Sequence, residues 1–300
     1  MPITEATLNR PRYPPELLPD AQLITFGAAG TQFPLQVRRL PWLVNLERVS
    51  TNRSALASVQ LNADERLGLE RTTNAKGLLA DGDPAGMWAT SSIEISLRAT
   101  GALANFPIWY NLWAIPATTA LKLHLGMGLS PRDEELAAKY DLVSKVAQGV
   151  LPLPLSTIIE REYRSQVRFA DTVLFSGATT VAGVTAAQLR PGRADELLVL
   201  RGIRAEDPGG GSELLELAIK RDDDNDYLAL RARALAGLDD FVPCFVPALS
   251  ELTFTARGVA VGAWRLGLEV WHVRLTEAHR ARFGLPASAE AIEQALAGVA

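Results

Sequence analysis

VRFADTVLF (Val167–Phe175) and ELLVLRGIRAE (Glu196–Glu206) belong to a series of eight short apolar runs that fill the second half of the chain. The other six runs are TTVAGVTAAQL (179–189), ELLELAIK (213–220), YLALRARAL (227–235), FVPCFVPAL (241–249), ELTFTARG (251–258) and WRLGLEVWHVRL (264–275). Turn residues such as Pro191-Gly192 separate them. Short strands at such regular spacing predict an antiparallel β-sandwich or jelly roll, and they argue against a parallel α/β sheet.

The first half contains further segments in which apolar and polar residues alternate. These segments are centred on Phe33–Val37, Ile93–Leu97 and Leu121–Met127. A period of two places every second side chain on the same face of a strand, so each segment predicts a half-buried strand. The polar, glycine-rich stretch 62–86 between them predicts a long loop.

A helix interrupts the strands at SPRDEELAAKYDLVSKVAQG (130–149). Ser130 is suited to cap its first turn together with Asp133, Pro131 fits the first helical position, and Gly149 can end the helix. Leu136, Tyr140, Val143 and Ala147 then lie on one face. A second amphipathic helix is predicted from Ser288 to Val299.

These elements predict a mainly β chain with one or two inserted helices. Residues 1–50 contain seven prolines, and we expect them to form an extended Pro-rich N-terminal arm followed by a first strand. Residues 51–300 are then a single antiparallel β-sandwich or jelly-roll domain, with the helical insertion at about 130–149. We expect the arm, with Pro14 and Pro15, to contact a neighbouring subunit.

Composition excludes several classes of protein. With 30 basic and 34 acidic residues among 300 and a formal charge of −4, nothing favours a phosphate backbone, so we expect no nucleic acid partner. The single cysteine cannot form an internal disulfide, and the first residues lack the pattern of a secretory signal. All but five of the basic residues are arginine, which fits a GC-rich genome and a heat-loving source.

The segment between Arg98 and Lys122 contains no charged residue and is long enough to cross a bilayer. Pro107 and Pro116 would break a spanning helix, so we expect buried strands instead. The aromatic cluster in this segment is a candidate contact with another subunit or with lipid headgroups, because aromatic rings suit half-wet surfaces. Its members are Trp109, Tyr110 and Trp113.

The acidic stretch RDDDND (221–226) resembles a metal site. A calcium loop would use Asp222, Asp224 and Asp226, but it needs a glycine where Tyr227 stands and a glutamate where Arg233 stands. Apolar residues alternate into and out of the stretch, which predicts the turn of a β-hairpin. Weak calcium binding through the three aspartates is the alternative.

No catalytic motif was found, and we expect no cofactor, no metal and no enzymatic activity. The three histidines lack the spacing of a zinc motif, and LKLHLGMG lacks the His-x-His pair of a metal-binding cupin. Bulky apolar neighbours predict that Cys244 is a buried structural thiol. Glu160 and Glu162 are candidate paired carboxylates, but Glu160 and Arg164 at i,i+4 predict a surface ion pair.

The run from Val167 to Thr276, with LVLRGI and the closing LGLEVWHVRLTEAHRARFGL, resembles the single-jelly-roll coat proteins of tailless icosahedral, membrane-containing thermophilic bacteriophages. The resemblance lies in strand pattern and size, so no functional residue is carried over. It implies a virion (capsid) protein that is assembled in the host cytoplasm. The implied partners are copies of the chain itself, a second coat protein and an internal viral membrane.

Two other functional classes stay open at this point. A sugar- or receptor-binding β-sandwich of a spike or tail would use the six tryptophans as stacking platforms. An enzyme whose site is assembled from scattered residues is the second alternative.

Overall fold

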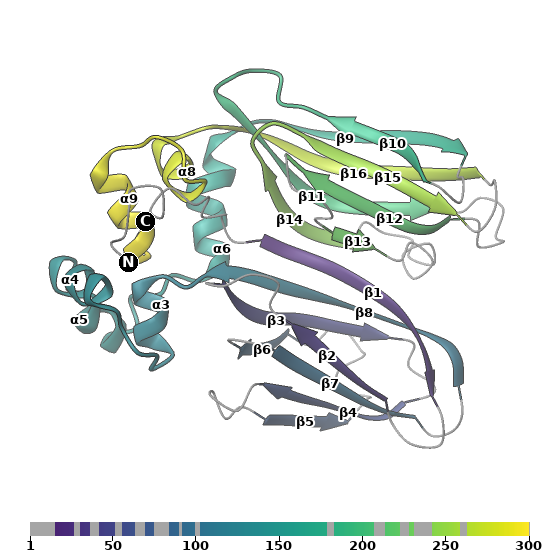
Figure 1. Cartoon of the computed structure of the whole chain (residues 1–300), viewed down its shortest axis with the longest axis horizontal. Helices are drawn as coiled ribbons and strands as arrows, with labels where there is room; N and C mark the ends of the chain where they lie inside the picture. Colours follow the sequence, from purple (N-terminus) through teal and green to yellow (C-terminus); the bar gives the residue numbers. More distant parts are fainter. Residues whose placement is uncertain are drawn as a thin grey trace, which may run out of the picture. The chain divides into compact units, whose positions relative to one another are not determined.

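The chain is seen in a computed structural model whose described residues are 16–26, 31–36, 42–51, 56–63, 70–74, 84–89, 92–99, 103–178, 183–206, 214–222, 228–230, 242–258 and 263–299. It is mainly β, and the strands pair antiparallel (Figure 1). Two units divide it: a helical unit of Ile115–Phe169 and Val273–Ala300, and a β unit of Glu16–Ala114 and Ala170–His272.

Eight strands come before the helices. They are β1 (Glu16–Phe26), β2 (Thr31–Gln36), β3 (Trp42–Thr51), β4 (Leu56–Ala63), β5 (Glu70–Asn74), β6 (Pro84–Ala89), β7 (Ser92–Ala99) and β8 (Leu103–Pro116). One sheet holds the first, eighth, third and sixth of these strands in the order β1-β8-β3-β6, and the other holds the rest in the order β2-β7-β4-β5. Two sheets interleaved in this way form a jelly roll.

Eight more strands follow the first helices. They are β9 (Val167–Ala178), β10 (Val184–Leu189), β11 (Glu196–Glu206), β12 (Leu214–Arg221), β13 (Leu228–Leu230), β14 (Val242–Ala248), β15 (Leu252–Gly258) and β16 (Ala263–Arg274). Their sheets are β9-β16-β11-β14 and β10-β15-β12-β13, so the first, eighth, third and sixth strands again share one sheet. The second half of the chain is therefore a jelly roll with the same strand order as the first.

Two jelly rolls in one chain correct the prediction of a single jelly-roll domain over 51–300. The first begins inside the predicted arm, since residues 16–51 supply β1, β2 and β3. Residues 1–15, with Pro14 and Pro15, lie outside the described residues. The predicted loop at 62–86 contains β5 and the start of β6. The first jelly roll was not predicted because apolar and polar residues alternate only weakly in these short strands.

The two jelly rolls share a sheet. β1 lies between β8 of its own jelly roll and β14 of the second, so the larger sheets of both jelly rolls join into one sheet of eight strands. At the junction Leu17 is opposite both Trp113 and Phe245. β1 and β14 come from opposite halves of the sequence, so their pairing links the two jelly rolls.

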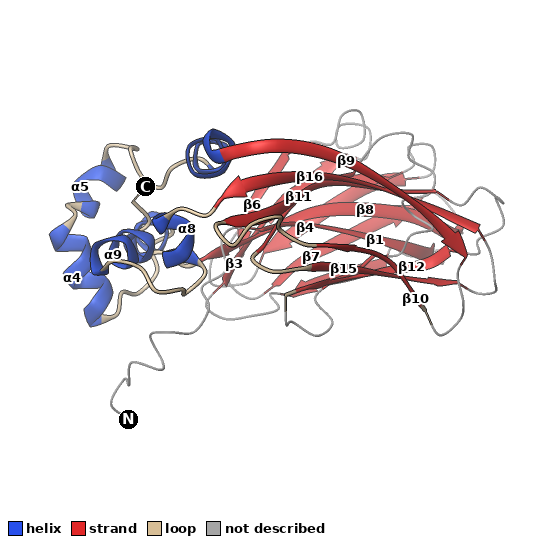
Figure 2. Cartoon of the chain, turned by 90° about the horizontal axis from the view of Figure 1, so that it is seen from above, coloured by secondary structure: helices blue, strands red, loops and turns tan. Residues whose placement is uncertain are grey.

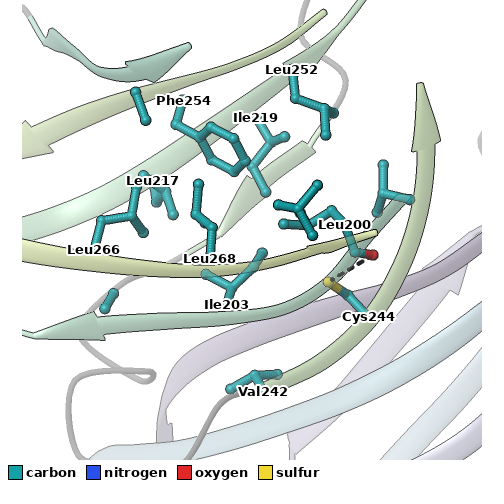
Figure 3. Packing of buried hydrophobic residues seen from close by; sticks show 14 of the residues in the cluster. Leu200, Ile203, Leu217, Ile219, Val242, Cys244, Leu252, Phe254, Leu266 and Leu268 are labelled. Atoms are coloured by element: carbon teal, nitrogen blue, oxygen red, sulfur yellow. Dashed lines mark hydrogen bonds between the residues drawn. The ribbon is translucent and has the colours of Figure 1, made fainter. Parts of the chain in front are cut away.

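The strands predicted at Phe33–Val37 and Ile93–Leu97 are present as β2 and β7. Phe33 lies opposite Ile95, and Leu35 lies opposite Ile93, so the apolar positions of β2 and β7 face one another. In the second jelly roll the apolar cluster between the sheets includes Leu200, Phe254, Leu266 and Leu268 (Figure 3). Such a cluster stabilises the sandwich because it removes apolar surface from water.

Residues 121–124 are helical and residues 125 and 126 form a turn, which corrects the strand predicted over 121–127. Helix α3 (Thr119–His124) begins at Thr118, whose hydroxyl accepts the backbone N–H of Leu121, and it buries Thr119, Ala120 and Leu121. Leucines at alternate positions over six residues fit one and a half helical turns as well as a short strand, so the period did not distinguish the two.

The predicted helix at 130–149 is present in two pieces, α4 (Pro131–Lys139) and α5 (Leu142–Ala147). The capping box of Ser130 and Asp133 and the first-turn Pro131 are confirmed. Asp141 interrupts the helix with a left-handed φ of 51°. The break turns the apolar face, so Leu142 is buried whereas Val143 is 61% exposed.

The remaining helices complete the helical unit (Figure 2). They are α6 (Leu155–Ile158), a π turn (Ile159–Tyr163), a 3-10 turn (Arg164–Gln166), α8 (Glu277–Arg282) and α9 (Ala289–Ala297). The helix predicted from Ser288 is present as α9, and the Ser288 hydroxyl caps it by accepting the backbone N–H of Ala291. Residues of α3, α4, α5 and α9 form its core, and Glu293 of α9 pairs with Arg132 and Lys139 of α4. Residues 273–299 thus pack with residues 115–169 in one unit.

Candidate assembly surface

The acidic stretch forms the predicted hairpin. β12 and β13 pair antiparallel on either side of it, with Ile219 opposite Leu228. Asp222 adopts a left-handed φ of 49°, and its carboxylate accepts the backbone N–H groups of Leu249, Ser250 and Glu251 at 3.2, 2.7 and 3.0 Å. Its own N–H donates to the carbonyl of Glu251. Asp222 therefore ties the β12–β13 turn to the β14–β15 turn.

This use of Asp222 argues against a metal site, because both carboxylate oxygens already accept hydrogen bonds. Asp224 and Asp226 lie outside the described residues. Among the residues that the structure does describe, no group of three or more His, Cys, Asp or Glu side chains could hold a metal ion.

The interior of the second jelly roll is filled by apolar side chains, including Phe254, Leu266 and Trp264. Cys244 lies within this cluster, where its thiol approaches the carbonyl oxygen of Leu200 at 3.6 Å (Figure 3). Burial raises the pKa of the Cys244 thiol, so the residue is inert, as predicted. A cupin needs polar ligands in this space, and the apolar cluster leaves no room for them.

Each of the three histidines has a local structural explanation. His124 is in the last turn of α3. His279 caps α8, where its Nδ1 accepts the backbone N–H of Thr276 at 3.2 Å. His272 Nδ1 lies 2.6 Å from Oε1 of the buried Glu196.

The two glutamates proposed as a carboxylate pair have separate cation partners. Glu160 pairs with Arg164 on the surface at 2.7 Å, as predicted. Glu162 instead accepts from Nε and NH2 of Arg282, at 2.7 and 2.5 Å, and both side chains are only 8% exposed. This buried pair joins the π turn to α8. The Glu162–Arg282 pair could not be predicted from local motifs, because its two residues are 120 positions apart in the sequence.

The predicted aromatic contact surface is corrected at Trp113. Its side chain is only 6% exposed, and its ring lies 6.0 Å from that of Phe245, measured between centroids. Trp113 therefore packs across the junction of the two jelly rolls within one chain. Trp109 and Tyr110 belong to β8 and lie opposite Ala21 and Asp20 of β1, but their side chains lie outside the described residues.

Two other tryptophan side chains also pack against residues of the same chain. Trp264 is 4% exposed inside the second jelly roll. The guanidinium carbon of Arg201 lies 4.3 Å above the centroid of the Trp271 ring, at the distance of a cation–π contact. Trp113 and Trp264 are therefore buried, and one face of the Trp271 ring is covered by Arg201.

The side chains best placed to contact another molecule lie on β9. This strand is at the edge of the eight-stranded sheet, and its only described neighbour there is β16. Leu174 is 77% exposed, and Phe169 is 50% exposed. The strand was predicted from the sequence, but its exposure was not, because an uncharged run such as TVLFSGA (172–178) normally indicates burial.

In the described part of the chain, no helix is long and apolar enough to span a membrane. The uncharged segment between Arg98 and Lys122 instead contains the last residue of β7, all of β8 and the start of α3.

Comparison with known proteins found no matching family model and no matching curated sequence. Solved structures that are similar include the MCP of Sulfolobus Turreted Icosahedral Virus, with 12% identity, a TM-score of 0.22 and coverage of 86% of this chain and 97% of that one. The major capsid protein P2 of bacteriophage PM2 has 10% identity, a TM-score of 0.22 and the same coverage. VP2 of infectious bursal disease virus has 10% identity, a TM-score of 0.24 and coverage of 91% and 74%. TM-scores this low do not place the chain in a family.

Proposed function

We propose that this protein is a structural virion protein, a building block of an icosahedral shell that assembles from many copies of the chain. The observation that carries the proposal is the repeated jelly roll: sixteen strands form two jelly rolls of identical strand order that share one sheet. Jelly rolls are used mainly in viral shells, lectins and cupins. The interior and the tryptophans distinguish these classes.

A cupin-type enzyme is disfavoured because the interior of the second jelly roll is filled by the side chains of Phe254, Leu266 and their neighbours. A lectin is disfavoured because Trp113, Trp264 and Trp271 already pack against residues of the same chain. A shell protein needs neither an interior site nor free aromatic rings. It needs a rigid block with extended outer faces, and two fused jelly rolls supply one.

The shared sheet also suits a tiling protein. The β1–β14 pairing joins the two jelly rolls within one chain, so two blocks are placed in each binding event and less freedom is lost per block on assembly. Symmetric packing then needs only complementary faces. A second coat protein and the surface of an internal membrane remain proposed partners. The net charge of −4 gives no support to a nucleic acid partner.

The experiment that tests the proposal is electron microscopy of the native source particle, combined with quantified gel bands for this chain. Hundreds of copies on a lattice are expected. A few copies at the vertices, or no particle containing the chain, would overturn the shell function and favour the receptor-binding class. A shift in melting temperature on adding glycans would identify that class directly, because a ligand that binds only the folded state raises its stability.

A further inference from the structure

The three sheets end in six edge strands: β6 and β9, β10 and β13, and β2 and β5. An edge strand presents unpaired backbone N–H and C=O groups, which are a template for a strand of another chain. Natural proteins block such pairing with charges, proline, bulges or very short edge strands. The edges of this chain differ in whether they carry these features.

All four edges of the smaller sheets are blocked. β2 has Pro34 in its middle, and β5 begins with the charged residues Glu70 and Arg71. β13 is only three residues long. The pairing of β10 with β15 shifts register between Thr185 and Ala187, which marks a bulge. These edges are therefore poor templates for another strand.

Within the described residues, no strand pairs with the outer side of β9 or of β6, the two edge strands of the eight-stranded sheet. β9 is twelve residues long, and its part from Thr172 to Ala178 has neither charge nor proline. Leu174 is 77% exposed there, whereas the neighbouring Phe175 packs against the core. β6 has Pro84 at its first residue and an irregularity next to it, because the pairing with β3 shifts register between Leu46 and Arg48; the following Met87–Ala89 pairs regularly and is uncharged. An apolar, unblocked edge in a folded protein marks a docking surface.

The pairing of β1 with β14 inside the chain indicates which edge strands can pair between two copies. Its junction joins the first strand of the first jelly roll, β1, to the sixth strand of the second, β14, and the strands are antiparallel. The two open edges are the first strand of the second jelly roll, β9, and the sixth strand of the first, β6. If β9 of one copy pairs with β6 of another copy, a first strand again meets a sixth strand, and the order of strands continues from one sheet into the next.

We propose that β9 of one copy docks antiparallel on β6 of a second copy and so repeats the β1–β14 junction between molecules. The inference deepens the proposed shell function and rests on it, because it names the contact by which copies add to one another. Such a contact is head-to-tail, so it continues until a ring closes or a filament grows. Leu174 becomes buried against the neighbouring copy.

The first test places a charge on the proposed docking strand of the full chain. Leu174→Lys and Ser176→Lys alter exposed side chains, and a lysine on an edge strand opposes pairing. Thr185→Lys is the matched control, since it puts the same residue at an exposed site on another edge strand, β10. Mass photometry over a range of concentrations, with circular dichroism to check folding, measures the association.

We expect the wild type and Thr185→Lys to associate equally and the two β9 variants to associate about tenfold more weakly or not at all, which corresponds to about one decade in Kd. Association of folded Leu174→Lys and Ser176→Lys at the wild-type level would overturn the proposal. So would a wild-type chain that stays monomeric at every concentration.

The second test identifies the partner strand by cysteine cross-linking. The only natural cysteine, Cys244, is 1% exposed, so introduced cysteines report alone. Leu174→Cys chains are mixed with Met87→Cys chains or with Trp88→Cys chains, because adjacent residues of β6 point to opposite faces. We expect a disulfide between unlike chains in one of the two mixtures. Cross-linking of Leu174→Cys only to itself would show pairing of two β9 strands and overturn the assignment of β6.

The outcomes separate this inference from the proposed function. If the chain forms a particle lattice but its assembly is insensitive to Leu174→Lys, only the docking contact is wrong. If the β9–β6 cross-link forms in solution but the chain is absent from particles, the contact is right and the shell function is wrong.

Discussion

Trp113 of β8 and Phe245 of β14 pack against each other with ring centroids 6.0 Å apart and planes tilted by 42°, although one belongs to the first jelly roll and the other to the second. They flank β1, whose Leu17 lies opposite both. Both rings are buried, at 6% and 0% exposure. This contact is a side-chain bridge between the two jelly rolls, so we expect it to couple their stabilities.

We expect Trp113→Ala and Phe245→Ala each to lower the free energy of unfolding by about 3–5 kcal/mol, because each leaves a large buried cavity. In a double-mutant cycle followed by urea unfolding, the pair should show a coupling of about 1 kcal/mol. Trp113→Ala combined with Phe254→Ala, in the interior cluster of the second jelly roll, is the control and should be additive. Additivity of the first pair would mean that the rings do not link the jelly rolls.

Asp222→Ala should lower the free energy of unfolding by about 2 kcal/mol, because it removes a charged acceptor of backbone N–H groups in the turn Leu249–Glu251. Asp222→Asn should cost less, since its amide keeps one acceptor oxygen and tolerates the left-handed φ. The exposed Asp171→Ala on β9 is the control and should be nearly neutral.

The same variants decide between the turn and the alternative metal site. Calcium should leave the melting temperature of the wild type unchanged. A rise in melting temperature with calcium that disappears in Asp222→Ala would show that the carboxylate binds metal after all.

The helical unit should lose stability in acid through Asp133. Although burial raises the pKa of this carboxyl, hydrogen bonds from Lys122, Ser130 and Thr119 outweigh that effect and hold its pKa at about 2. The unfolded value is near 3.9, so the folded state binds protons more weakly. The stabilisation is therefore complete above pH about 4 and is lost as the pH falls toward 2, with a magnitude of about 2 kcal/mol.

The measurement is the difference in free energy of unfolding between the wild type and Asp133→Asn from pH 6 to pH 2. We expect that difference to shrink as the pH falls, because the other titrating groups cancel between the two proteins. Glu135→Gln, an exposed carboxylate in the same helix, is the control and should give a nearly flat difference. A flat difference for Asp133→Asn would contradict the assigned hydrogen-bond network.

Gly177→Ala should destabilise the second jelly roll by about 1–3 kcal/mol through overpacking. A Cβ at Gly177 on β9 would lie 2.6 Å from Cζ2 of Trp264, whose ring is buried and has little room to shift. Gly128→Ala is the matched control because no heavy atom lies within 4 Å of its added Cβ. Tryptophan fluorescence during urea unfolding measures both variants, and equal stabilities would show that the Trp264 ring moves aside freely.

The sequence alone predicted those features that depend on neighbours along the chain. Alternation identified the strands of the second half and, in the first half, β2 and β7. Local chemistry placed the capping box at Ser130 and Asp133, the hairpin at RDDDND, the surface pair of Glu160 and Arg164, and the inert Cys244. Each of these depends on backbone period, on side-chain bonds within four residues, or on the apolar character of the immediate flanks.

Only the tertiary structure decided how the strands are ordered and which surfaces are left open. Sheet order depends on pairing between distant residues, such as Leu17 with Phe245, and the period of a strand does not encode its partner. Trp113 and Leu174 show the consequence. Both are apolar strand residues, but the first is 6% exposed because it packs against Phe245 of the second jelly roll, and the second is 77% exposed because it lies on the face of β9 opposite to the core-facing Phe175.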